Sequence, residues 1–271
     1  MLKDGIHYEH PIFAEPVAEI FGFVITNTLL TSYIVTIFLI ILAFVVNRKI
    51  KQNPGRLQNG FEMIIESFLG IFDSLTGSRE RSLKFFPLVF AFFIFILFNN
   101  LVGILPGVGS IGQIISSGGE KYFIPYIKNA TADLNATLSF ALVGVVASHI
   151  IGVLTIGVWK YINKFVNLDA LIEIPKKIRK EPSVLMINPI KIFTGMIEII
   201  SEIAKVASLS FRLFGNIFAG KILLAFMMGI FAFGLPIPFI FMEFLVGFMQ
   251  AFIFSLLVLA YLVTMTTAEG H

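Results

Sequence analysis

The sequence predicts an all-α, polytopic membrane protein with five membrane-embedded helical segments and one amphipathic interfacial helix, the last two segments being long and strongly tilted. The first reason is composition, because 57% of the 271 residues are hydrophobic, 14% are charged, and the mean hydropathy is +0.90. Such a chain has too little polar surface to cover a soluble globule. Apolar runs long enough to cross a hydrocarbon core of about 30 Å also recur along the sequence. Charged and proline-containing loops separate these runs.

We expect a single membrane domain, 1–271, that begins with an outer segment at 1–19. The N-terminal third of this domain contains two predicted helices. The apolar run 20–46 is too long for a signal-peptide core and follows no basic opening segment, so we expect it to remain as the first membrane helix. Residues 57–75 place apolar side chains three and four positions apart, with acidic residues elsewhere. This pattern is typical of an amphipathic helix lying in the membrane interface.

Four more apolar segments complete the prediction, at 85–105, 134–159, 190–233 and 237–267. Pro106 ends the second span, and Pro236 and Pro238 separate the last two helices. No proline occurs from Ile190 to Leu235, and this stretch would extend about 69 Å as one helix. A helix more than twice as long as the hydrocarbon core is thick must tilt steeply or lie nearly flat.

Lys and Arg are concentrated in two loops. Seven lie between Arg48 and Lys84, and seven lie between Lys160 and Lys191, a loop that we expect to extend through Pro189. By the positive-inside rule these loops face the cytoplasm, which places the N-terminus outside and the C-terminus in the cytoplasm. We expect the cytoplasmic (inner) membrane of a bacterium, although an organelle-encoded copy would share the pattern. Because the basic residues behind the net charge of +3 lie mostly in loops, we expect no nucleic-acid partner.

Cysteine and histidine give no sign of a catalytic or metal site. The chain has no Cys, which excludes disulfides, thiolate metal ligands and cysteine nucleophiles. Its four His residues do not cluster. We therefore predict no catalytic residue, no metal and no cofactor, and we expect His149 to be a packing or channel-wall residue.

The segment 190–233 carries ionisable residues, which are costly in a membrane helix and therefore candidates for function. They are Glu198, Glu202, Lys205, Arg212 and Lys221. At 100° per residue, Glu198, Glu202, Lys205, Ser208 and Asn216 lie within about 80° of Arg212 and form a polar line, whereas Lys221 lies on the opposite face. In the last segment, Glu243 and Gln250 share a face. The alternative for such residues is a packing role, in interhelical hydrogen bonds or ion pairs such as Lys221 with Glu243. For Ser208, a packing role and a functional role are given equal weight.

Arg212 favours a functional interpretation most strongly. Its guanidinium stays protonated, and no carboxylate lies within one turn of it in the sequence. A permanent cation in the middle of a membrane without a local partner implies an anion from another chain.

Four stretches resemble the F-type ATP synthase subunit a family. The most specific is the run SLSFRLFGNIFAG from Ser208 to Gly220, and the others are FNNLVGILP at 98–106, DLNATLS at 133–139 and QAFIF at 250–254. The resemblance implies a non-catalytic stator subunit that forms two offset half-channels against a ring of c subunits and couples proton, or possibly sodium, flow to rotation. It also implies b-type peripheral stalk subunits, the remainder of the complex and the lipid bilayer as partners, with ATP chemistry in other subunits.

The resemblance also assigns roles by position. Arg212 is similar to the arginine that attracts the ring carboxylate and blocks a direct leak, and Asn216 to the asparagine one turn away. Glu198 and Ser208 resemble the cytoplasmic-side path, while Asp133, Glu243 and Gln250 resemble the lining of the outer half-channel. Lys221 departs from the Glu or His that many relatives carry, so a proton relay and a fixed countercharge both stay open for it.

The alternative function is a secondary ion-coupled transporter, which also places charged residues in the middle of the membrane. Such folds usually show paired halves with corresponding helix breaks. Five unequal spans with one polar helix argue against this class. Ion identity depends largely on the carboxylate site of the c ring, and ring size and the direction of operation also depend on other chains.

Overall fold

The computed structural model describes residues 6–7, 12–50, 55–105, 107–117, 120–166, 184–231, 234 and 236–267. Most of these residues are helical, so the chain is an all-α, polytopic membrane protein, as the sequence predicts. Within the described ranges, five helices are long and apolar enough to cross a membrane. They are α1 (Asn27–Lys49), α3 (Arg79–Val102), α4 (Leu134–Ile156), α7 (Val184–Ile230) and α8 (Pro236–Thr266). Pro106, which we expected to end the second span, and residues 167–183 of the second basic loop lie outside the described residues.

The first membrane helix begins at Asn27 and not near residue 20. Residues Pro16–Ile20 (β2) and Phe23–Thr26 (β3) instead form an antiparallel hairpin. The stretch is apolar, but β3 consists of aromatic and β-branched residues that favour a strand. The Thr26 side chain then accepts a hydrogen bond from the backbone N–H of Leu29, which caps the first turn of α1.

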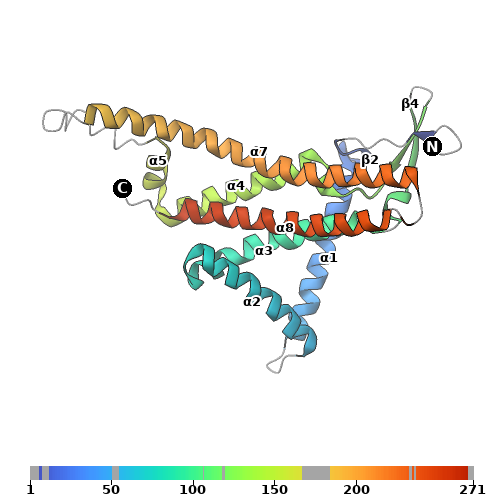
Figure 1. Cartoon of the computed structure of the whole chain (residues 1–271), viewed down its shortest axis with the longest axis horizontal. Helices are drawn as coiled ribbons and strands as arrows, with labels where there is room; N and C mark the ends of the chain where they lie inside the picture. Colours follow the sequence, from blue (N-terminus) through green and yellow to red (C-terminus); the bar gives the residue numbers. More distant parts are fainter. Residues whose placement is uncertain are drawn as a thin grey trace.

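Three further strands, which the sequence analysis did not predict, form a second small sheet. They are β1 (Ile6–His7), β4 (Gly112–Ser117) and β5 (Glu120–Pro125). β4 pairs antiparallel with β5, and β1 adds to the other edge of β5 in parallel orientation. Figure 1 places both small sheets near one end of the helical bundle. They lie in the residues before α1 and in the loop between α3 and α4.

Two shorter helices accompany the membrane helices. The helix α2 (Arg56–Thr76) is close to the predicted interfacial helix at 57–75 and ends at Gly77, whose φ of 68° is favourable for glycine. The helix α5 (Val158–Val166) was not predicted separately, because the apolar run 134–159 continues into it. Gly157, with a φ of 92°, separates α4 from α5.

The helix α7 is longer than predicted. It begins at Val184 and includes Pro189, which we had placed in the preceding loop. Pro189 lies close to the beginning of α7, so the N–H that it lacks removes only one backbone hydrogen bond near the helix end. Pro236 is the first residue of α8, where a missing donor costs little, so it marks the break between the two long helices as expected.

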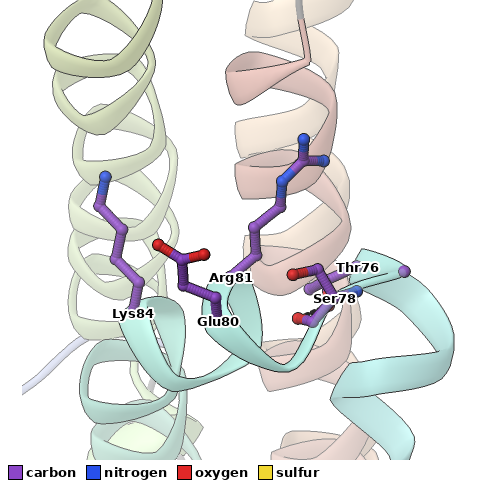
Figure 2. A pocket seen from close by; sticks show the side chains of 6 residues that line it. Thr76, Ser78, Glu80, Arg81 and Lys84 are labelled. Carbon is purple, nitrogen blue, oxygen red and sulfur yellow. Dashed lines mark hydrogen bonds between the residues drawn. The ribbon is translucent and has the colours of Figure 1, made fainter.

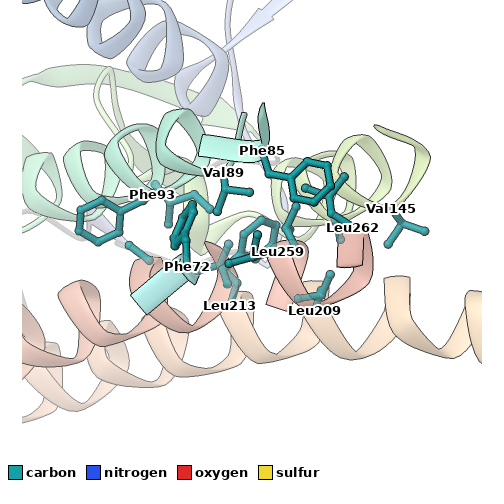
Figure 3. Close-up of a cluster of buried hydrophobic side chains, with 14 of the residues drawn as sticks. Phe72, Phe85, Val89, Phe93, Val145, Leu209, Leu213, Leu259 and Leu262 are labelled. Carbon is teal, nitrogen blue, oxygen red and sulfur yellow. The ribbon is translucent and has the colours of Figure 1, made fainter. Parts of the chain in front are cut away.

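Four helices enclose the hydrophobic core. Buried residues of α3, α4, α7 and α8, together with Phe68 and Phe72 of α2, form one contiguous cluster. Figure 3 shows Leu209 and Leu213 of α7 directed toward Leu259 and Leu262 of α8. Figure 1 shows α7 and α8 running side by side along the long axis of the molecule, with α1 lying across that direction. α1 and the α7–α8 pair therefore cannot both stand along the membrane normal, and the strong tilt of the last two helices stays a prediction.

Candidate ion-translocation site

Arg212 lies on the outer surface of α7. Its side chain is exposed, and its Nη2 donates a hydrogen bond to Ser208 Oγ at 3.3 Å. Ser208 and Asn216 are exposed on either side of it. Among the described residues, no carboxylate forms an ion pair with Arg212. The structure thus brings the predicted site residues Ser208 and Asn216 close to Arg212, whose guanidinium forms no ion pair within the described residues.

A different face of the same helix anchors it in the core. Leu209, Leu213 and Ile217 are each only 1% exposed. Their spacing of four residues gives α7 one buried apolar face in this stretch, and Arg212 lies outside it. The neighbouring Phe211 is also apolar and 61% exposed. This combination is typical of a surface that packs against lipid or another membrane protein.

Lys221 and Glu243 line one cleft of about 650 Å³. The cleft lies between the C-terminal half of α7, the beginning of α8 and the loops that follow α3 and β5. Other polar side chains in its lining include Glu15, Lys128 and Asn129. The predicted Lys221 and Glu243 therefore share one compartment, although they come from different helices.

Glu243 is a buried carboxylate without a hydrogen-bond partner in the described part of the chain. Its side chain is only 3% exposed, and neither of its oxygens finds a donor among the described residues. Gly220 of α7 faces it, because a Cβ added at Gly220 would lie 3.8 Å from Glu243 Cγ. An unpaired buried charge is costly in a purely structural role, so this carboxylate is suited to binding and releasing a cation or proton.

Asp133 and Gln250 differ from Glu243 in their surroundings. Asp133 is buried and caps α4, accepting hydrogen bonds from the N–H of Asn135 at 3.1 Å and from Thr28 Oγ1 at 3.0 Å. These contacts give Asp133 a structural role that joins α4 to α1. Gln250 is 9% exposed on α8, on the same face as Glu243. Neither residue lines the cleft.

A polar cluster that sequence reasoning missed lies near the other end of the polar line. Glu202 of α7 contacts Lys205 Nζ at 2.6 Å through Oε1 and His149 Nε2 of α4 at 3.4 Å through Oε2. His149 Nδ1 is hydrogen-bonded to the hydroxyl of Tyr161 in α5. The predicted Glu198 is half-buried on the same helix. Spacing alone indicated Glu202 with Lys205, but the contacts with α4 and α5 depend on the tertiary fold.

The Tyr161 hydroxyl is strongly affected by this environment. Burial raises the pKa of Tyr161 to about 12, and the negative charges of Glu202 and Glu198 act in the same direction. Tyr161 is therefore neutral near pH 7 and can serve as a fixed hydrogen-bond partner of His149.

A second cavity, of about 420 Å³, lies at the turn between α2 and α3. Figure 2 shows Glu80, Arg81 and Lys84 projecting in the same direction from the first turns of α3. Arg79, next to them, joins the two helices through ion pairs of 2.9 Å with Glu66 and with Asp73. None of the predicted site residues lines this cavity, so it is separate from the polar line of α7 and from the Lys221–Glu243 cleft.

The fold and the site define a class first: a polytopic, all-α membrane protein whose two longest helices carry the ionisable side chains of its candidate site. Comparison with known proteins then gives the family. Residues 29–263 match the family model described as ATP synthase A chain. The chain belongs to the ATP synthase subunit a family, which confirms the resemblance seen in the sequence.

Similar proteins cover nearly the whole chain. The ATP synthase subunit a of Syntrophobacter fumaroxidans is 32% identical over 260 residues, which is 96% of this chain and 91% of the relative. That of Geotalea daltonii is 31% identical over 240 residues, which is 89% of this chain and 87% of the relative. That of Moorella thermoacetica is 29% identical over 247 residues, which is 91% of this chain and 93% of the relative.

Proposed function

We propose that this chain is the ion-translocating stator subunit of a rotary F-type ATP synthase. The observation that carries the proposal is the exposed Arg212, which has no acidic partner among the described residues and lies next to the exposed apolar side chain of Phe211. An unpaired guanidinium in a membrane helix requires an anion from outside the chain. A carboxylate on a rotating ring of c subunits supplies one.

The outer half-channel in this proposal is the cleft that contains Lys221 and Glu243. Glu243 takes up the ion there, because its buried oxygens have no hydrogen-bond partner within the described ranges. Gln250 lies farther along the same face of α8, toward the level of Arg212, and Asp133 supports the wall of this half-channel by fixing α4 to α1. Lys221 acts in the same cleft, as a relay or as a fixed countercharge.

The inner half-channel follows the exposed and half-buried polar residues of α7 on the other side of Arg212. Glu198 and Ser208 line it, and Asn216 lies one turn beyond the arginine. Arg212 attracts each ring carboxylate, displaces its ion and prevents direct passage between the half-channels. Each elementary charge that crosses about 100 mV then releases about 2.3 kcal/mol, which drives rotation.

The remaining parts of the proposal concern the complex. The apolar surface beside Arg212 supports contact with the c ring, and b-type stalk subunits and the rest of the complex hold the chain stationary. The basic loops support an orientation in a bacterial cytoplasmic membrane with the N-terminus outside and the C-terminus in the cytoplasm. The chain itself makes no covalent bond, and either protons or sodium ions are the transported species.

The test is ATP-driven ion pumping by proteoliposomes that contain the whole complex, with proton and sodium uptake measured in parallel. Arg212→Ala is compared with Arg81→Ala, which removes an exposed arginine at the beginning of α3. We expect Arg212→Ala to abolish pumping while the complex stays assembled, and Arg81→Ala to pump normally. If Arg212→Ala pumped as fast as the unmodified complex, the proposal would be wrong.

A further inference from the structure

Lys205 is a second cation on the polar line of α7. It lies seven residues before Arg212, about two helical turns and about 10 Å away, and within about 20° of the same direction. In the proposed function, a c-subunit carboxylate that is attracted to Arg212 would also be attracted to an uncompensated ammonium group at Lys205. A second such cation would hold the ring carboxylate away from the position between the half-channels.

The structure pairs Lys205 but not Arg212. Lys205 Nζ lies 2.6 Å from Glu202 Oε1, and its ammonium also lies 5.3 Å from the centre of the Tyr261 ring. Both members of the pair are mostly shielded, with side-chain exposures of 19% for Lys205 and 12% for Glu202. Arg212, in contrast, has only the Ser208 hydroxyl as a hydrogen-bond partner within the described ranges.

Glu202 is held from a second direction by two other helices. Its Oε2 contacts His149 Nε2 of α4 at 3.4 Å, and the other ring nitrogen of His149 is bonded to the Tyr161 hydroxyl of α5. Tyr161 is itself in contact with Met265 Sδ of α8 at 3.6 Å. Each carboxylate oxygen of Glu202 thus has its own partner, and His149 fixes the one that does not face Lys205.

We propose that Glu202 is a positioning residue that neutralises Lys205, with His149 and Tyr161 holding its carboxylate in place, so that Arg212 stays the uncompensated cation that the ring carboxylate meets. This inference rests on the proposed function of Arg212. It assigns a role to a cluster that lies outside both half-channel linings named above. A cluster that only ties α4, α5 and α7 together would predict a different response to paired substitutions.

The decisive experiment compares Glu202→Gln, Lys205→Gln and the double variant in the whole complex, by ATP-driven ion pumping per assembled complex. We expect Glu202→Gln to lower pumping about tenfold, Lys205→Gln to change it less than about twofold, and the double variant to pump about as well as Lys205→Gln. Recovery in the double variant follows from charge neutrality and not from packing. The proposal is overturned if the double variant is as impaired as Glu202→Gln, or if Glu202→Gln pumps normally.

A second pair makes the test independent of how well Glu202→Gln assembles. His149→Ala should lower pumping, and adding Lys205→Gln should restore it, because a misplaced Glu202 matters only while Lys205 is charged. Failure of this recovery also overturns the proposal. Arg212→Ala, measured in the same series, separates the two ideas. Normal pumping by Arg212→Ala rejects the proposed function. If Arg212→Ala loses pumping but the double variants do not recover it relative to Glu202→Gln and His149→Ala, only the role of Glu202 is rejected.

Discussion

The hydroxyl of Thr137 in α4 lies 3.2 Å from the hydroxyl of Ser210 in α7, and both residues are buried. Ser210 is two residues before Arg212, which places the two side chains about 160° apart around the helix. The contact therefore fixes the rotation of α7 beside Arg212. With Ser210 turned toward α4, Arg212 must face away from the bundle.

Glu243→Gln should separate activity from stability. The amide keeps the volume of the side chain but removes the charge, so ion-driven ATP synthesis at limiting outer ion concentration should fall about tenfold or more. Because Glu243 is buried and neither of its oxygens has a hydrogen-bond partner among the residues that the structure describes, the same change should leave thermal stability unchanged or raise it. Synthesis rates and thermal midpoints of the purified complex measure both effects. Glu19→Gln, at an exposed site on β2, is the matched control, and an unaltered synthesis rate for Glu243→Gln would make Glu243 a packing residue.

Gly152→Ala should destabilise the bundle. A Cβ at Gly152 would lie 2.9 Å from the carbonyl oxygen of Met265 in α8 and 2.9 Å from the Tyr161 ring in α5. Relieving such overlap costs about 1–3 kcal/mol in a packed core. Gly70→Ala in α2 is the control, because nothing lies within 4 Å of its added Cβ and alanine favours a helix. The temperature at which the subunit leaves the complex should fall for Gly152→Ala only; equal behaviour of the two variants would contradict the close approach.

Tyr161→Phe should change the response to alkaline pH. The pKa of Tyr161 is raised from 10.0 to about 12 in the folded chain, so the folded state holds its proton more tightly than the unfolded state. The stability that this provides is fully present below pH 10 and is lost as the pH rises through about 12. The variant lacks this contribution and should therefore lose less stability than the unmodified chain across this window. Difference absorbance titration of tyrosinate measures the pKa directly, and an ordinary value near 10 would refute the buried placement of the Tyr161 hydroxyl near Glu202 and Glu198.

The five membrane helices could be predicted because apolar run length alone distinguishes them. The start of the first helix was predicted near residue 20 instead of Asn27, because the strand at 23–26 is as apolar as the helix that follows it. The break at Gly157 was missed for a similar reason, since the apolar pattern continues through it. Sequence thus indicated which segments enter lipid more reliably than where each helix begins.

The candidate site was predictable where its residues share one helix. Helical spacing brought Ser208, Arg212 and Asn216 together, and the structure places all three on the exposed face of α7. The cluster around Glu202 was not predictable, because His149 and Tyr161 reach it from α4 and α5. The hydrogen bond that Asp133 accepts from Thr28 was likewise hidden, since Thr28 lies in a different helix.

The most direct test of the central claim is disulfide cross-linking between this chain and a c subunit that carries a cysteine beside its membrane carboxylate. The chain has no cysteine, so each engineered thiol is unique within it. Asn216→Cys places a thiol on the exposed face of α7 that carries Arg212, and Ser210→Cys places one on the buried face of α7 toward α4. The account predicts a cross-linked a–c product for Asn216→Cys and none for Ser210→Cys. No product from Asn216→Cys in an assembled complex, or equal products from both, would contradict the placement of Arg212 against the ring.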